Sequence, residues 1–279
     1  MKDLCDALKI SKQAFYQMLK RKQEQMACEF EVIEEVKKLR KDHPTMGMRD
    51  MYRTINPERL GRDKFCALCR SYNLQSRRYK NFYRTTDSSG VIRFDNLTTD
   101  YVCNDINQVW VSDITYYQTL GKFYYITFIM DAYSRNILGY SLSSDLKMVN
   151  TTEPALQMAL NVRKGFEWKE LIFHSDGGGQ YYATDFIKLL RDNNIVSSMC
   201  EYAWENGKAE RINGVIKNNY LRHFDQRTLN ELRVSLDRAV YLYNNEKPHS
   251  ALNYLSPVEF EMSYISLEQQ TKPKMTKSL

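Results

Sequence analysis

The stretch of sequence that most constrains the fold is 171–180, which reads LIFHSDGGGQ. Its first three residues are apolar and predict a buried strand, and the three glycines near its end allow the backbone to turn sharply directly afterwards. Asp176 therefore lies at a strand tip, where open α/β sheets carry their functional groups. A single Asp-Gly pair is more often only a turn, so the significance of Asp176 depends on two further carboxylates, Asp113 and Glu210.

The residues around this stretch predict an alternation of strands and helices. Three β-rich runs joined by short turns predict an antiparallel meander, and helices and two more strands follow. This order is that of a ribonuclease H-like α/β fold, in which helices flank a mixed five-stranded sheet. The expected strands are 109–119, 123–131, 137–143, 171–176 and 195–200, and the expected helices are 152–162, 184–192, 206–222 and 228–245.

Positive charge is concentrated in the first third of the chain. Residues 1–84 hold 20 Lys and Arg against 11 Asp and Glu, whereas the remaining 195 residues hold 20 against 23. A basic region joined to a slightly acidic body suggests a polyanionic partner for the basic part. An ordinary solvated basic surface is the alternative, so charge alone does not establish DNA binding.

The beginning of the chain suggests a helix-turn-helix. Apolar residues in 3–20 recur at helical spacing, the pattern is interrupted near Lys9, and Ser11 is a suitable N-cap for a second helix. The exposed face of that second helix could meet a major groove of DNA. Two packed helices without a DNA role explain the pattern equally well. The residues expected to contact DNA there are Lys12, Gln13, Tyr16 and Gln17.

A second possible DNA contact follows three more expected helices at 30–41, 48–55 and 62–72. In residues 75–84 basic side chains are interleaved with aromatic ones, a mixture that suits contact with a nucleic-acid backbone. The basic residues concerned are Arg77, Arg78, Lys80 and Arg84.

These patterns predict a chain of four parts. An all-α, helix-turn-helix-like region comes first, and a polar linker of weak periodicity joins it to the α/β core. The expected bounds are 1–84 for the DNA-binding region, 85–104 for the linker, 105–265 for the catalytic core with its C-terminal helices, and 266–279 for a polar tail.

The cysteines and the apolar runs argue against a zinc site and a membrane segment. Cys66 and Cys69 are the only close pair, without a second pair or paired histidines, so we expect packing residues rather than zinc ligands. The longest apolar run, 123–130, has eight residues and is too short to span a bilayer. The pattern is typical of a cytosolic protein with reduced thiols.

Asp113, Asp176 and Glu210 form a set of possible metal ligands without histidine or cysteine. Such hard oxygen ligands suit Mg²⁺ or Mn²⁺ rather than zinc. In the expected fold the first strand lies beside the fourth, so Asp113 and Asp176 are neighbours, and Glu210 approaches from a helix packed across the sheet. Three clustered carboxylates repel one another unless a cation is bound. Two ions held in this way could support in-line attack on a phosphodiester.

Five separated motifs resemble those of a known family. They occur in order at 110–116, 128–135, 174–181, 206–214 and 243–252, and the likeness covers about 105–262. Together they resemble the integrase-type (DDE) catalytic core of bacterial insertion-sequence transposases of the second-reading-frame class. The resemblance implies the fold of retroviral integrase and a catalytic triad of Asp113, Asp176 and Glu210.

The position of the third carboxylate separates two kinds of enzyme with this fold. Ribonuclease H-type hydrolases take it from the helix after the third strand, where Glu153 lies, whereas integrase-type enzymes take it from the helix after the fifth, where Glu210 lies. Glu153 has a structural explanation as a first-turn residue favoured by the helix dipole. Asn213 and Lys217 share a helix face with Glu210 and could contact a DNA phosphate.

The resemblance implies a DNA transposase that cleaves the ends of a mobile element and transfers the freed 3′-hydroxyl to target DNA. It further implies two Mg²⁺ or Mn²⁺ ions as cofactors and double-stranded DNA as the partner. A homo-oligomer on DNA, an upstream small DNA-binding protein of the same element, and a bacterial cytoplasmic location are also expected. A hydrolytic nuclease of the same fold and a DNA-binding regulator with an inert core stay open as alternatives.

Overall fold

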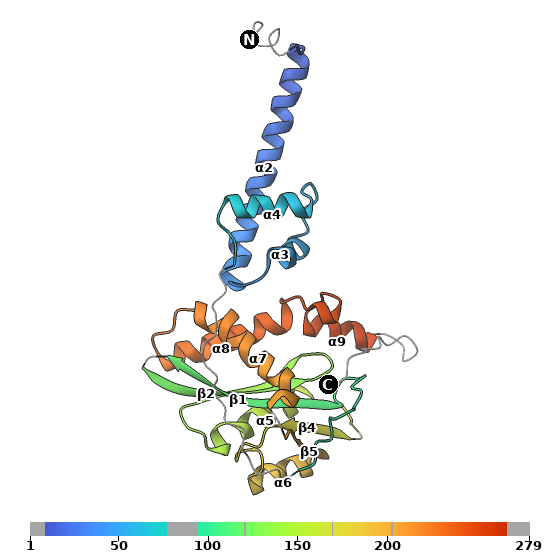
Figure 1. Ribbon diagram of the computed structural model, residues 1–279, viewed down its shortest axis with the longest axis vertical. Coiled ribbons are helices and arrows are strands. Elements are labelled where there is room, and N and C mark those ends of the chain that lie inside the picture. The colour runs from blue at the N-terminus through green and yellow to red at the C-terminus, as the bar shows by residue number, and fades with distance from the viewer. Residues whose placement is uncertain (1–8, 77–93, 120, 169, 202, 267–279) are drawn as a thin grey trace. The chain divides into compact units, whose positions relative to one another are not determined.

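The computed structural model describes residues 9–76, 94–119, 121–168, 170–201 and 203–266 (Figure 1). The chain divides into two compact units, Met1–Tyr79 and Lys80–Leu279. The first unit is helical and the second contains a β-sheet with helices on both faces. Each unit is described by itself.

Three α-helices make up the described part of the first unit: α2 (Lys12–Asp42), α3 (Met48–Ile55) and α4 (Arg62–Ser71). Helix α2 begins where a helix was predicted, because the Ser11 side chain accepts a hydrogen bond from the Ala14 amide at 3.1 Å. The expectation of a separate helix at 30–41 is wrong. No Gly or Pro occurs within α2, so one helix of 31 residues continues without a break. The helix predicted before residue 9 lies outside the described residues.

Helices α3 and α4 pack beside the C-terminal half of α2 around a small apolar core. Val36, Met51 and Phe65 are fully buried in this core. Cys66 and Cys69 are buried in the same cluster and are free thiols, which confirms that they are packing residues.

Arg40 of α2 ties the connecting segments of the first unit together. Its guanidinium donates hydrogen bonds to the backbone carbonyls of Pro44 at 2.9 Å, Met46 at 2.8 Å and Leu74 at 2.9 Å. These carbonyls lie on both sides of the α3–α4 pair, so one side chain fixes the pair against α2. Between α3 and α4 the chain turns at Asn56, whose φ of 46° lies in the left-handed region that Asn tolerates.

The second unit is built on a five-stranded sheet in the order β3-β2-β1-β4-β5. Strands β1, β2 and β3 form the predicted antiparallel meander, while β4 pairs in parallel with both β1 and β5. The fold is therefore ribonuclease H-like, as expected from the order of elements. The strands are β1 (Val109–Thr119), β2 (Lys122–Asp131), β3 (Ile137–Ser143), β4 (Leu171–Ser175) and β5 (Ile195–Met199).

Helices cover both faces of this sheet and make three layers (Figure 1). Because side chains alternate along β1, Trp110 joins the core under α5 and α6, whereas Val109 and Val111 join the core under α7, α8 and α9. The α-helices are α5 (Thr152–Val162), α6 (Thr184–Asp192), α7 (Gly207–Asn219), α8 (Leu229–Asn245) and α9 (Pro257–Ser266).

Four short 3₁₀ helices complete the described elements of this unit. They are η1 (Met148–Asn150), η2 (Ala203–Asn206), η3 (Leu221–His223) and η4 (Ser250–Leu252). The helix expected at 206–222 ends three residues earlier, at Asn219, because the backbone leaves the α-helical conformation at Tyr220, with φ −126° and ψ −71°.

Part of the segment expected to be a linker, residues 94–104, lies against the sheet. The Leu97 amide donates to Ser198 Oγ at 2.9 Å, and the Met199 amide donates to the Asp95 carbonyl at 3.4 Å. Thr98 is buried beside His174. These contacts attach the segment to the edge strand β5.

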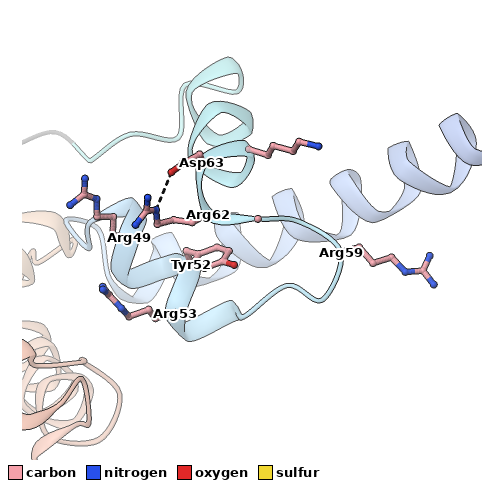
Figure 2. A pocket seen from close by; sticks show the side chains of 8 residues that line it. Arg49, Tyr52, Arg53, Arg59, Arg62 and Asp63 are labelled. Atoms are coloured by element: carbon pink, nitrogen blue, oxygen red, sulfur yellow. Dashed lines mark hydrogen bonds and ion pairs between the residues drawn. The ribbon is translucent and has the colours of Figure 1, made fainter.

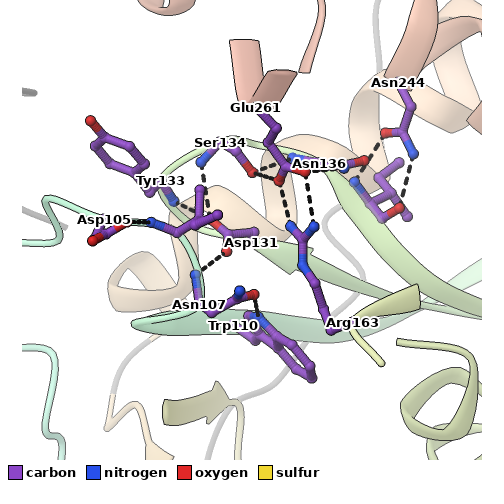
Figure 3. Close-up of polar contacts among 12 residues, drawn as sticks. Asp105, Asn107, Trp110, Asp131, Tyr133, Ser134, Asn136, Arg163, Asn244 and Glu261 are labelled. Atoms are coloured by element: carbon purple, nitrogen blue, oxygen red, sulfur yellow. Dashed lines mark hydrogen bonds and ion pairs between the residues drawn. The ribbon is translucent and has the colours of Figure 1, made fainter. Parts of the chain in front are cut away.

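A buried polar cluster fastens helix α9 to the sheet (Figure 3). Arg163, at the end of α5, forms a two-pronged ion pair with Glu261 of α9, in which Nη1 lies 2.9 Å from Oε2. Ser134 and Asn136, from the turn between β2 and β3, donate to the same carboxylate. The Glu261 carboxylate is therefore fully paired although it is buried.

Asp131 at the end of β2 supports the same turn. Its carboxylate accepts hydrogen bonds from the backbone amides of Asn107 at 2.6 Å, Tyr133 at 2.9 Å and Ser134 at 3.0 Å. Complete burial raises the pKa of Asp131 to about 6, and these amides oppose the rise. Asp131 is thus a structural carboxylate that holds a turn.

Replacing Arg163 with Met is expected to lower the free energy of unfolding by about 3–5 kcal/mol, because the Glu261 carboxylate is then buried without a cation. Urea denaturation followed by circular dichroism measures the change. Arg191→Met, at an exposed position on α6, is the control and should cost less than about 0.5 kcal/mol. Equal effects of the two substitutions would contradict a stabilising role of the ion pair.

Candidate active site

Asp113 and Asp176 are neighbours because β1 and β4 pair in parallel. In the register of this strand pair, Val111 lies opposite His174. Continuing this register by two residues brings Asp113 level with Asp176, which directly follows β4. The predicted adjacency of these two carboxylates is therefore a consequence of the strand order.

Helix α7 brings the third carboxylate to the same region. Its residues Ala209, Ile212 and Ile216 are buried in the core under the sheet. At the start of the helix, the Asn206 side-chain amide donates to the Ser112 carbonyl at 2.9 Å and so ties the helix to β1. Glu210, one turn along, remains exposed.

Asn213 and Lys217 of α7 are directed at β1. The Asn213 side-chain amide donates to Asp113 Oδ2 at 2.6 Å, and the side chain is buried. The Lys217 ammonium donates to Thr115 Oγ1 and to the Tyr116 carbonyl, the latter at 3.3 Å. Both residues thus contact the strand that carries Asp113, and the contact with DNA predicted for them stays a prediction.

The electrostatics of Asp113 link the three acids. Burial, and then the negative charges of Asp176 and Glu210, raise the pKa of Asp113 to about 8, while Lys217 opposes the rise. Burial also raises the pKa of Asp176, and the backbone amide of Gly178, which donates to it at 3.1 Å, opposes that rise. Asp176 and Glu210 therefore lie close enough to Asp113 to disfavour its ionisation.

The acidic site suits a divalent cation by its chemistry. Its donors are carboxylate oxygens, and the Asn213 carbonyl oxygen beside them is buried without a hydrogen-bond partner among the residues that the structure describes. A cation would offset the repulsion that now raises the pKa of Asp113. Within the described ranges, however, no three His, Cys, Asp or Glu side chains are already arranged to hold a metal ion. The assignment of Asp113, Asp176 and Glu210 as metal ligands stays a prediction.

Two buried polar contacts support the strands below the site. The Tyr181 hydroxyl and Ser112 Oγ are hydrogen-bonded at 2.9 Å. His174 Nδ1 and Ser198 Oγ lie 3.0 Å apart, and burial lowers the pKa of His174 to about 4. His174 is therefore neutral at pH 7 and joins β4 to β5.

The two groups of residues predicted to contact DNA from the first third of the chain have different outcomes. Lys12, Gln13, Tyr16 and Gln17 are exposed on the first turns of α2, so their side chains are accessible. Arg77, Arg78, Lys80 and Arg84 lie outside the described residues.

A basic groove between α3 and α4 was not predicted from the sequence (Figure 2). Arg62 pairs with Asp63 at 3.0 Å, and Arg53 pairs with Asp50 at 3.2 Å. The side chains of three further cations make no hydrogen bond or ion pair in the described part of the chain, and they are Arg49, Arg59 and Lys64. The density of basic residues in 49–64 was a signal that the sequence already contained. We call these five basic residues the α3–α4 groove.

The second unit belongs to a known class of domain. Residues 104–203 and 197–257 match two family models that are both described as integrase core domain. The chain therefore belongs to the integrase core domain family, as the sequence motifs indicated.

The curated relatives are proteins of bacterial insertion elements. The 31 kDa protein of IS600 from Shigella sonnei is 29% identical over 210 residues, which cover 74% of this chain and 76% of that protein. The IS629 transposase of the same species is 26% identical, covering 80% of this chain and 76% of its own length. Transposase InsF of IS3A from Escherichia coli is 31% identical, covering 59% of this chain and 57% of its own length.

Solved structures of integrases are also similar to the chain. The catalytic core domain of HTLV-2 integrase in complex with magnesium is 22% identical, with a TM-score of 0.46 over 55% of this chain and 95% of that one.

Searched over its described residues, the chain has no helix that could cross a membrane.

Replacing Asp113 with Asn is expected to stabilise the metal-free protein at high pH. Above about pH 8 Asp113 is ionised in the folded protein, which then carries the full free-energy cost of the buried charge. Below about pH 4 Asp113 is neutral in both the folded and the unfolded protein, so there is no such cost. In EDTA, Asp113→Asn should raise the free energy of unfolding by on the order of 2 kcal/mol at pH 9, and by less toward pH 5.

Urea denaturation at several pH values measures this difference. Added Mg²⁺ should reduce it, since a bound cation stabilises the ionised form of Asp113. Asp192→Asn, at an exposed position on α6, is the control and should show no such dependence on pH. If Asp113→Asn is less stable than the parent protein at every pH, the ionised Asp113 carboxylate does not destabilise the folded protein, and the raised pKa of Asp113 is refuted.

Proposed function

We propose that the chain is a DNA transposase that cleaves strands at the ends of an insertion element and joins the freed 3′-hydroxyl to target DNA. The observation that carries this proposal is the effect of the charges of Asp176 and Glu210 on Asp113, which gathers three acids beside the end of β4 within an integrase core domain. The names of the similar insertion-element transposases support the same reaction.

Each strand transfer breaks one phosphodiester bond and forms one bond to phosphorus. In cleavage, water attacks the phosphorus and the 3′-oxygen leaves as a hydroxyl. In joining, that hydroxyl attacks the phosphorus of a target phosphodiester, and the 3′-oxygen of the target strand leaves as a hydroxyl. Mg²⁺ or Mn²⁺, held by the three acids, would activate the attacking oxygen and stabilise the leaving one. Asn213 orients Asp113 through its hydrogen bond, and Lys217 supplies positive charge beside the same carboxylate.

The choice of Glu210 over Glu153 has a geometric argument. Asp113 has the same parity along β1 as Val109 and Val111, whose face is covered by α7. Glu153 lies in the first turn of α5, which packs on the opposite face, and it accepts a hydrogen bond from Gln157 at 3.0 Å. Glu153 therefore lies on a helix that covers the opposite face of the sheet from Asp113. This position favours strand transfer over the hydrolytic alternative.

Glu210→Gln is expected to abolish both strand cleavage and strand joining while leaving folding and DNA binding intact, because it removes one charge from the acid cluster. Glu153→Gln should keep most of the activity and cost at most about 1 kcal/mol of stability. Both reactions are measured on one labelled oligonucleotide that carries an element end. If Glu153→Gln is inactive and Glu210→Gln is active, the chain is a hydrolytic nuclease.

Two controls separate the remaining alternatives in the same assay. The parent protein should require Mg²⁺ or Mn²⁺, and full activity in EDTA would contradict the assigned chemistry. A parent protein that binds the oligonucleotide but neither cleaves nor joins it would instead be a regulator with an inert core.

We further propose that the α3–α4 groove binds the phosphate backbone of duplex DNA. Arg49, Arg59 and Lys64 are exposed cations of one groove without side-chain partners in the described residues, so they are available to phosphates. Two helices joined by a short connection, here residues 56–61, are a common arrangement for meeting a duplex. DNA binding by the first unit thus does not require the helix predicted before residue 9.

The triple substitution of Arg49, Arg59 and Lys64 by Ala should weaken DNA binding and lower the slope of log affinity against log salt by about 3, since each phosphate contact contributes about 0.9. Gel shifts at several salt concentrations measure both quantities. The triple substitution of Lys37, Lys38 and Lys41 by Ala removes the same charge from exposed positions on α2. Equal losses from both triples would mean that only net charge matters.

A further inference from the structure

The N-terminal half of α2 carries an exposed apolar stripe. Leu19, Met26 and Phe30 are 37%, 60% and 64% exposed, and Phe15 is partly exposed. At 100° per residue, these four positions fall within a sector roughly 60° wide around the helix. We call them the α2 stripe. An apolar face of this kind marks an interaction surface.

The α2 stripe is not part of the apolar core of the first unit. That core takes its contacts with α2 from Val32 onward. Within this unit, α2 continues well beyond α3 and α4 toward its N-terminal end (Figure 1). A partner for the stripe therefore has to come from outside the described core of this unit.

The spacing of the α2 stripe is symmetric. Phe15 and Phe30 are equally far along the chain from a point between residues 22 and 23, and so are Leu19 and Met26. If a second α2 is laid alongside in the opposite direction about that point, Phe15 faces Phe30 and Leu19 faces Met26. Every residue of the stripe then meets an apolar residue.

The charges of the same segment select the antiparallel direction. Residues 12–22 contain four Lys and Arg and no Asp or Glu, whereas 23–33 contain three Glu and no Lys or Arg. A parallel pair would place like charges side by side along its whole length. An antiparallel pair about the same midpoint places each basic block beside an acidic block.

We propose that α2 forms an antiparallel pair with α2 of a second copy of this chain. The two-fold axis passes between Lys22 and Gln23, and the α2 stripe forms the centre of the contact. Such an interface is isologous, because the same surface is used by both copies. The pairing rests on α2 alone and does not depend on the reaction proposed for the second unit.

Sedimentation velocity on the full chain, without DNA, tests the association over about 1–100 µM. We expect a concentration-dependent dimer, and Leu19→Ser with Met26→Ser should raise its dissociation constant by more than about tenfold, since each lost contact occurs twice about the axis. Gln17→Ser is the matched control, because residue 17 lies roughly 160° around the helix from Leu19. A monomer at every concentration, or equal behaviour of the double variant and the control, overturns the proposal.

Cysteine cross-linking tests the direction of pairing. In a chain in which Cys5 and Cys28 are replaced by Ser, Leu19→Cys and Met26→Cys are prepared separately and oxidised alone and as a mixture. The antiparallel pair predicts a disulfide mainly in the mixture, because the two positions face each other, whereas each is offset by about two helical turns from the same position in the other copy. Faster cross-linking of each variant with itself would indicate a parallel pair and overturn the proposal.

Discussion

The parallel contact between β1 and β4 is the interaction on which the candidate site depends. It brings Asp113 level with Asp176, although β2, β3 and helix α5 separate the two residues in the sequence. The alternation of side chains along β1 then directs Asp113 to the face under α7, where Asn213 contacts it. The positions of the acids are therefore fixed by the register of two strands and by a packed helix. Such elements are less mobile than a loop.

Two groups of buried carboxylates in the second unit differ in how they are paired. Asp131 accepts three backbone amides, and Glu261 has an arginine and two further donors. Asp113 accepts from the Asn213 side-chain amide and the Ile114 backbone amide and has Lys217 nearby, but it also has two negative neighbours, Asp176 and Glu210. The negative neighbour of Asp131 is Glu261, which is itself paired with Arg163, and this contrast separates Asp131 from the proposed site acid Asp113 more clearly than sequence position does.

The sheet was predictable because each strand or helix in the second unit is bounded by turn residues, and the expected 109–119, 137–143, 152–162 and 184–192 agree with the structure. The full length of helix α2 was not predictable, because no Gly or Pro marks where the half that packs against α3 and α4 begins. Periodicity also showed that Asn213 and Lys217 share a face, but not that this face turns toward β1. The α3–α4 groove forms only once a turn brings Arg49 near Arg62 (Figure 2).

The first unit carries two surfaces whose proposed roles are separable. Lys12 and Tyr16, expected to contact DNA, lie in or beside the sector of the α2 stripe, whereas Gln13 and Gln17 lie on the opposite side of the helix. Pairing of α2 would therefore compete with DNA for the first two residues and leave the other two exposed. The α3–α4 groove is formed by residues outside α2, so pairing of α2 and binding of DNA in the groove use different residues of one copy.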